Sequence, residues 1–114
     1  MEVEAAVREH ARRTISREPE ARDDLAPGAE LTPPDLLERL GRTRFEGFEL
    51  VAHAKIGVHH VFKTKFVGPT VIVVQARWAR EAGGRWQIRE AEIVRTEVGL
   101  ARDVQSSLPP SGPE

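Results

Sequence analysis

Hydrophobic residues recur at three- and four-residue steps along the first part of the chain. Between residues 3 and 15 they fall on one side of a helix, while most charged residues fall elsewhere. Acidic residues come early and arginines late, which suits the helix dipole, and Pro19 marks either the end of this helix or the start of another. The stripe consists of Val3, Ala6, Val7, His10, Ala11, Thr14 and Ile15. This pattern predicts an amphipathic helix whose apolar side packs on the rest of the domain.

The segment from Ser16 to Leu31 has a weaker pattern. Its first part, SREPEARDDL, is compatible with a short helix that ends before Ala26-Pro27-Gly28. The alternative is an irregular connection, and no strand is expected between the first helices.

A sharper helix signal begins at Thr32, which can act as an N-cap. Pro33 suits the first helical position, and Gly41 follows LLERL as a C-terminal stop. We therefore predict a helix from Pro33 to Leu40. Its Leu36, Leu37 and Leu40 would cover one side of a sheet.

Beyond Arg44 the apolar residues recur at every second position. This alternation predicts strands over 48–56 and 58–67, joined by a turn at Gly57 and ended by Gly68-Pro69. A β-branched run over 70–80 and a second run over 85–97 predict a hairpin that turns at Gly83-Gly84. The expected fold class is α+β, with N-terminal helices packed on a four-stranded antiparallel sheet.

The last predicted hairpin is apolar on both faces. A two-residue turn would pair Arg77 with Glu90, Gln75 with Glu92 and Val74 with Ile93, and a four-residue turn keeps the same faces together. One face carries Ile72, Val74, Ala76, Trp78, Ala91 and Ile93, and the other carries Val71, Val73, Ala79, Trp86, Ile88 and Val94. Because a solvated face is less apolar than this, we expect one side to meet the helices and the other to meet a partner subunit. A homodimer through the sheet face is therefore predicted.

Length and composition fit one domain. The chain has 114 residues, enough to bury a modest core without metal or disulfide bonds. We assign residues 1–98 to a single α+β domain. Residues 99–114 contain few apolar side chains and two adjacent prolines, so we expect a disordered C-terminal tail.

Charge and cysteine content exclude several functions. Seventeen basic and 18 acidic residues give a formal net charge of -1, which argues against nucleic-acid or anionic-membrane partners. The chain has no cysteine, which excludes disulfides, thiol catalysis and cysteine-bound metal sites. The charged N-terminus and the lack of a long apolar stretch lead us to expect a cytoplasmic protein. No nucleophile elbow or phosphate-binding loop is found, and no cofactor is expected.

The order of elements and the final hairpin resemble a known superfamily. A strand ending in Ala76-Arg77-Trp78 meets Arg85-Trp86-Gln87-Ile88 across a glycine turn. This arrangement resembles the nuclear transport factor 2-like superfamily, which includes SnoaL-like polyketide cyclases and ketosteroid isomerase. The resemblance implies a curved sheet wrapped around a helix as a cone-like roll (a cystatin-like α+β cone), often dimeric, with a pocket in its mouth. Catalytic and non-catalytic members share the fold, so membership selects no reaction.

A group of histidines lies at the predicted turn around Gly57. If Ile56-Gly57 forms a two-residue loop, His53 and His60 face each other, and two imidazoles could begin a metal site. Such a site needs a third ligand, for which Glu49 is the nearby candidate, and no zinc-binding spacing is present. We therefore predict no metal site and interpret His53, His59 and His60 as sheet histidines.

Three residues are candidates for catalysis: His10, His60 and Glu90. His10 lies on the apolar stripe of the first helix, and His60 shares a face with Phe62 and Phe66. Each histidine is either an acid or base in a pocket or a core histidine bonded to a carbonyl.

Two interpretations of the polar group in the last hairpin stay open. If its face lines a cone, Glu90 would acquire a raised pKa and act as a general base, as pocket carboxylates of the superfamily do. If the face is a dimer interface, Arg77 and Glu90 form a cross-strand ion pair. The residues expected to line a ligand pocket are Phe62, Gln75, Arg77, Trp86 and Glu92.

Three functions are consistent with these features. The first is a small-molecule binding or accessory protein of the SnoaL-like type, with a partly apolar pocket between the first helix and the sheet. The second is an isomerase or cyclase that uses acid-base catalysis on an apolar carbonyl compound. The third is a structural or protein-interaction domain without a pocket.

Overall fold

The computed structural model describes residues 2–81 and 83–98 of the chain. The predicted disordered tail therefore lies outside the described residues. The first half contains helix α1 (Val3–Ile15), the 3-10 helix η1 (Pro19–Asp24), strand β1 (Leu25–Thr32) and helix α2 (Leu36–Arg42). Four strands follow: β2 (Gly47–Ile56), β3 (His59–Val67), β4 (Thr70–Arg80) and β5 (Trp86–Val98). No helix in the described part of the chain is long and apolar enough to cross a membrane.

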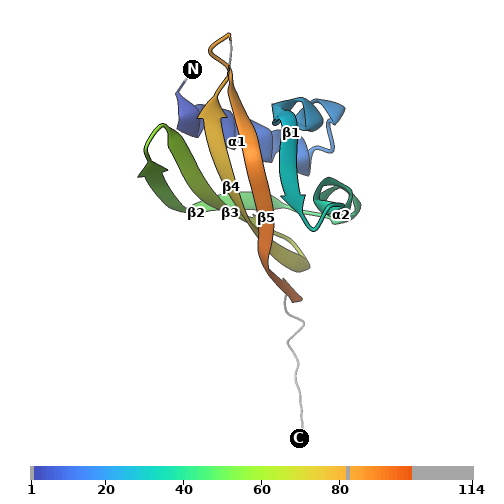
Figure 1. Cartoon of the computed structure of the whole chain (residues 1–114). Coiled ribbons are helices and arrows are strands. Elements are labelled where there is room, and N and C mark those ends of the chain that lie inside the picture. The colour runs from blue at the N-terminus through green and yellow to red at the C-terminus, as the bar shows by residue number, and fades with distance from the viewer. Residues whose placement is uncertain (1, 82, 99–114) are drawn as a thin grey trace, which may run out of the picture.

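The strands form one sheet, and the helices lie on one of its faces (Figure 1). The strand order is β1-β5-β4-β3-β2, with β1 parallel to β5 and the other neighbours antiparallel. The α+β class is therefore confirmed. The expected four-stranded antiparallel sheet is wrong, because the sheet has five strands and is mixed.

Strand β1 escapes sequence-based prediction because Pro27 and Gly28 lie inside it. Among the described strands β1 lies at the edge of the sheet and pairs with β5, and its register shifts between Leu25 and Glu30. Gly28 takes a positive φ of 75° within this irregular stretch. An edge strand tolerates a proline and a glycine where the ladder is interrupted. Pro27 and Gly28, which resemble the end of an element in the sequence, therefore mark an irregularity inside strand β1.

The helices agree with the expected pattern except at the two ends of α2. Buried residues of α1 fall on the predicted stripe, and the short helix expected before Ala26 is the 3-10 helix η1. Helix α2 begins at Leu36 after Asp35, because Thr32 pairs with Glu92 in the sheet and does not act as its cap. Gly41 lies within α2 and does not end it.

The predicted pairs of the last hairpin are confirmed, yet two side chains change face. Arg77 pairs with Glu90, Gln75 with Glu92 and Val74 with Ile93. The register then shifts, so that Trp78 lies opposite Ile88 and Arg80 opposite Trp86. This bulge at Arg89 turns Ile88 and Trp86 toward the helices. The outer face is therefore less apolar than expected and keeps Val71, Val73, Ala79 and Val94.

The hydrophobic core lies between the helices and the sheet. Its most buried large side chains are Trp78, Phe62, Leu36 and Ile88. Leu36 and Leu40 of α2 are buried in this core and Leu37 packs against it, as the sequence predicts. Burial of each such side chain contributes about 1.5–3 kcal/mol, so the core fixes α1 and α2 on the sheet.

Candidate functional site

A small cavity lies between the helices and the sheet. Its volume is about 20 Å³, which is room for roughly one water molecule. Apolar side chains of α1, α2 and four strands make up most of the lining, including Leu36, Leu37 and Leu40. Two lining residues are polar, His10 from α1 and Thr64 from β3. An apolar enclosure with a few polar groups is the usual form of a small-molecule site.

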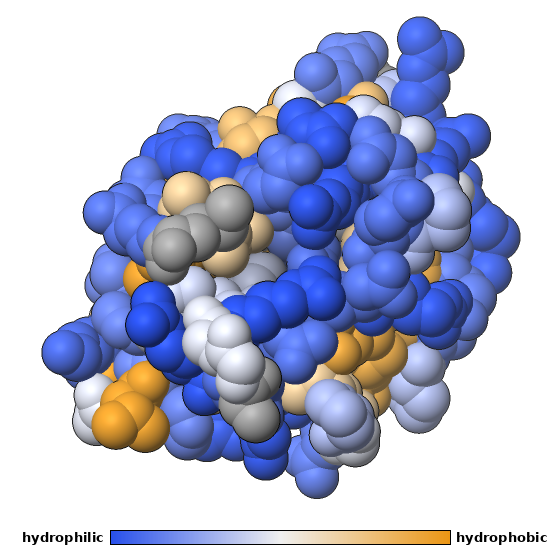
Figure 2. Space-filling model, turned by 90° about the horizontal axis from the view of Figure 1, so that it is seen from above, coloured by the Kyte–Doolittle hydropathy of each residue, from blue (hydrophilic) through white to orange (hydrophobic). Residues whose placement is uncertain are grey.

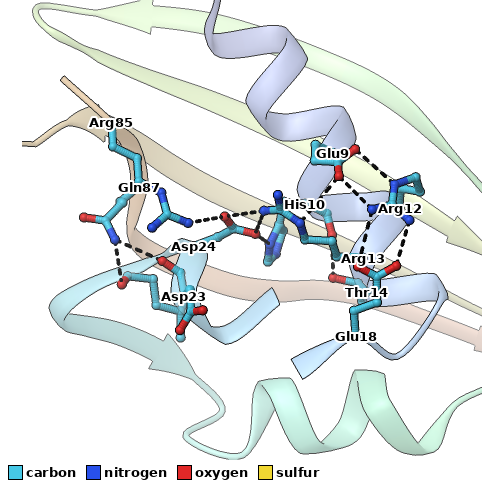
Figure 3. Close-up of polar contacts among 11 residues, drawn as sticks. Glu9, His10, Arg12, Arg13, Thr14, Glu18, Asp23, Asp24, Arg85 and Gln87 are labelled. Carbon is cyan, nitrogen blue, oxygen red and sulfur yellow. Dashed lines mark hydrogen bonds and ion pairs between the residues drawn. The ribbon is translucent and has the colours of Figure 1, made fainter. Parts of the chain in front are cut away.

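His10 is held in place by Asp24, the last residue of η1 (Figure 3). The distance from His10 Nδ1 to Asp24 Oδ2 is 2.8 Å, and the two side chains are only 12% and 6% exposed. The imidazole also makes an edge contact with Trp78, with ring centroids 5.7 Å apart. Because a carboxylate only accepts hydrogen bonds, His10 Nδ1 is the donor. In the neutral ring Nε2 is then the unprotonated nitrogen.

Two arginines complete the surroundings of Asp24 (Figure 3). Arg13 Nη1 lies 3.0 Å from Oδ1, and Arg85 Nη2 lies 3.2 Å from the same oxygen. Burial alone raises the pKa of Asp24, but the hydrogen bond from His10 and the charges of His10 and Arg13 outweigh it. The pKa of Asp24 is therefore lowered. Asp24 is a carboxylate at neutral pH and favours the Nδ1-protonated form of His10.

This arrangement gives the cavity one adjustable polar group. With Nδ1 bonded to Asp24, Nε2 is the ring nitrogen available to a molecule in the cavity. No hydrogen bond to His10 Nε2 is found within residues 2–81 and 83–98. Neutral Nε2 accepts a hydrogen bond from a hydroxyl or removes a proton, and protonated Nε2 donates to a carbonyl.

Figure 2 views the molecule from the end that carries the β4–β5 turn. Seen from that end, the surface is mostly hydrophilic, and hydrophobic residues form separate small areas (Figure 2).

His53 and His60 form a separate group on the β2–β3 hairpin. His53 Nε2 lies 2.9 Å from His60 Nδ1, and His53 stacks on Phe62 with ring centroids 4.0 Å apart. Ile56 pairs with His59, so the loop is Gly57-Val58, and His53 lies opposite Phe62 and contacts His60 diagonally. The two-residue Ile56-Gly57 loop, which would have set His53 directly opposite His60, is therefore not formed. Burial and the charges of His53 and Lys55 lower the pKa of His60.

The described residues contain no group of three His, Asp or Glu side chains that could hold a metal ion. Glu49, the possible third ligand, pairs with Lys65 on the sheet. Neither His53 nor His60 lines the cavity at His10.

The five residues expected to line a ligand pocket do not come together. Gln75, Arg77 and Glu92 line a groove of about 120 Å³ on the outer face of the sheet, together with Val61 and Glu90. Phe62 is buried in the core. Trp86 lies beside His60, with ring centroids 5.3 Å apart. None of the five lines the cavity at His10.

The outer groove contains the cross-strand ion pair between Arg77 and Glu90 that the dimer-interface interpretation predicts. Arg77 Nη2 lies 3.3 Å from Glu90 Oε1. Since Glu90 faces away from the helices, it is not placed to act on a molecule in the cavity. Arg77 Nε is buried without a hydrogen-bond partner in the described part of the chain.

Asp24 and Thr64 belong to the candidate site but are not predicted as site residues from the sequence. The sequence favours a helix cap or a solvated residue at Asp24, because no spacing rule connects it with His10. Asp24 reaches His10 only because η1 folds back along α1. Thr64 has a usable signal, since it lies between Phe62 and Phe66 on the inward side of one strand.

The sequence matches no protein-family model and no curated protein.

Proposed function

We propose that the domain binds a small, largely apolar molecule in the cavity beneath α1 and α2, with His10 as its polar anchor. One observation carries the proposal: a histidine oriented by a buried carboxylate lines an otherwise apolar cavity. Placing an ionised aspartate in the interior costs desolvation energy, so the arrangement is more typical of a functional site than of a core. Thr64 offers a second polar contact.

Ligand entry requires the cavity to widen. At about 20 Å³ the cavity is far smaller than the roughly 300 Å³ of ordinary ligand pockets. Leu37 and Leu40 of α2 form part of its wall. Displacement of this wall would widen the cavity.

Cyclohexanol is a suitable probe, because its apolar ring fits the lining and its hydroxyl can donate to His10 Nε2. We expect saturable shifts in ¹H–¹⁵N spectra at Ala11, Ala76 and Ala91, which line the cavity. His10→Leu should weaken binding by about tenfold, the worth of one hydrogen bond. His53→Leu, outside the cavity, should leave the affinity unchanged. Shifts confined to the outer face, or equal binding by His10→Leu, would contradict the proposal.

Acid-base catalysis on an apolar carbonyl compound is the second candidate function. The orientation of His10 by an ionised carboxylate favours it, because Nε2 is then the basic nitrogen. The test is exchange of the α-protons of cyclohexanone for deuterium in D₂O, followed by ¹H NMR. Catalysis should disappear in His10→Gln and persist in His53→Gln. A rate no faster than buffer would leave binding as the sole function of the site.

We further propose a homodimer that forms through the outer face of the sheet. Lys63 on β3 lies opposite Gln75 on β4, which lies opposite Glu92 on β5. A twofold axis along β4 would set Lys63 of one copy against Glu92 of the other, as an isologous interface requires. The exposed Val51 and Val94 supply apolar area on the same face.

The assignment to the nuclear transport factor 2-like superfamily belongs to this proposal. Helices over one face of a sheet, with a cavity between them, support the cone-like roll that the resemblance implies. A cytoplasmic location likewise stays a prediction. If the cavity binds nothing, the outer face would be the functional surface of a protein-interaction domain.

A further inference from the structure

A surface cleft lies directly outside the cavity. It has a volume of about 290 Å³ and is bordered by the C-terminal end of α1, by η1 and by α2. Its lining includes Thr14, Arg17, Arg22, Leu37 and Leu40. Leu37 and Leu40 also line the cavity at His10, so these two side chains form a common wall.

Leu37 is the part of this wall that can move most easily. Leu40 is 2% exposed and belongs to the buried core, whereas Leu37 is only partly buried and packs against the edge of the core. A change of rotamer at a partly exposed leucine loses fewer contacts than one at a buried leucine. Rotation of Leu37 would therefore join the cleft to the cavity.

The cleft carries positive charge at its rim. Arg17 forms no ion pair with any residue that the structure describes. Arg22 Nη2 lies 3.6 Å from Glu38 Oε2, but both side chains are exposed, so the pair is weak. Glu18 also lines the cleft, yet Arg12 already binds it at 2.8 Å. An anionic group on a ligand would find two available cations there.

From these contacts we infer that the cleft is the entrance to the cavity and that the ligand is an amphiphilic carboxylate. Its carboxylate binds Arg17 and Arg22, while its apolar body passes Leu37 and carries a hydroxyl or carbonyl group to His10. The inference rests on the proposed binding function and adds the class of ligand and the route of entry. The hydrophilic surface at the β4–β5 end agrees with entry from elsewhere (Figure 2).

Decanoate and 1-decanol test the charge requirement, because they share a chain and differ in the head group. Calorimetric titration at low salt should show decanoate binding at least tenfold more tightly than decanol. The double variant Arg17→Ala/Arg22→Ala should lose this preference and leave decanol unaffected. Arg42→Ala is the matched control, since Arg42 lies on α2 and outside the cleft lining. Equal affinities for the two probes would overturn the inference.

Leu37 variants test the route. Leu37→Trp should block binding of both probes while the far-ultraviolet circular dichroism spectrum stays unchanged. Should that variant unfold, Leu37→Ala tests the route instead. Shortening the side chain at residue 37 should speed decanoate association in stopped-flow measurements. An unchanged association rate in Leu37→Ala, or full binding by folded Leu37→Trp, would exclude this entrance. Cyclohexanol binding that depends on His10, without any decanoate preference, would reject the inference and keep the proposed function.

Discussion

At Asp24 a single carboxylate accepts hydrogen bonds from three side chains: His10 and Arg13 of α1, and Arg85 at the end of the β4–β5 turn. These contacts connect α1 and η1 with the β4–β5 turn, and Arg85 lies 61 residues from Asp24 in sequence. They also fix the tautomer of His10, on which the proposed function of the cavity depends. Asp24 is therefore both a structural residue and the residue that positions His10.

The stability of the protein should depend on pH through Asp24. Because its folded pKa is lowered, its contribution is fully present above its unfolded pKa of about 4 and disappears as pH falls through the folded value. Asp24→Asn should cost about 2 kcal/mol at neutral pH. Urea denaturation at a series of pH values should show that this difference shrinks in acid.

Asp23→Asn is the control for this measurement. Asp23 is exposed, and only its backbone oxygen contacts Gln87. Its substitution should leave the pH profile unchanged. A difference between wild type and Asp24→Asn that stays constant down to pH 2 would show that ionised Asp24 does not stabilise the fold.

At the scale of elements, sequence periodicity predicts the helix stripe and the hairpin pairs but not the irregularities. The pairing of Arg77 with Glu90 follows from alternation and the glycine turn. The bulge at Arg89 does not, because nothing in the local sequence distinguishes it from a continuous strand. Strand β1 is hidden for a related reason, since its tolerance of Pro27 depends on its place at the sheet edge. In the candidate site, the position of His10 is predictable from the apolar stripe of the helix. Its contact with Asp24 is not, because only folding brings the two together.

The bulge separates two residues that the sequence places on one face. Ile88 is 2% exposed and Val94 is 41% exposed. Ile88→Ala should therefore destabilise the protein by roughly 3 kcal/mol. Val94→Ala should cost well under half as much in the same thermal or urea denaturation. Similar costs for the two substitutions would mean that Ile88 does not face the core.

Substitution of Gly41 tests where α2 ends, since the sequence predicts an end before Gly41 and the structure places Gly41 inside the helix. As a helix stop it would resist substitution, whereas inside the helix it only lowers helix propensity. A Cβ added at Gly41 would meet no atom of another element within 4 Å. Gly41→Ala should raise the free energy of unfolding by about 0.5–1 kcal/mol. If Gly41→Ala instead lowers the free energy of unfolding in urea, Gly41 acts as the C-terminal end of α2.

At the scale of the whole molecule, the outer face of the sheet predicts self-association. Sedimentation velocity at high micromolar concentration should show a dimer. Lys63→Glu and Glu92→Lys should each weaken it by roughly tenfold through like-charge contact. The double variant should restore it, because the two charges then exchange places. Lys55→Glu, placed toward the helix side of β2, is the control.

A monomer at these concentrations would exclude the dimer. Failure of the double variant to recover the dimer would exclude the twofold arrangement along β4. Neither outcome bears on the cavity, which lies on the opposite face of the sheet.

In the proposed function, His10 is fixed by Asp24 and anchors a molecule in the cavity. The most direct measurement is the pair of ¹⁵N resonances of the His10 ring, recorded during titration with cyclohexanol. We expect Nδ1 to stay protonated throughout and the Nε2 resonance to move with saturation, because the probe's hydroxyl donates to it. Saturable binding elsewhere with both ring resonances unmoved, or a His10 protonated on Nε2 alone, would exclude His10 as the anchor.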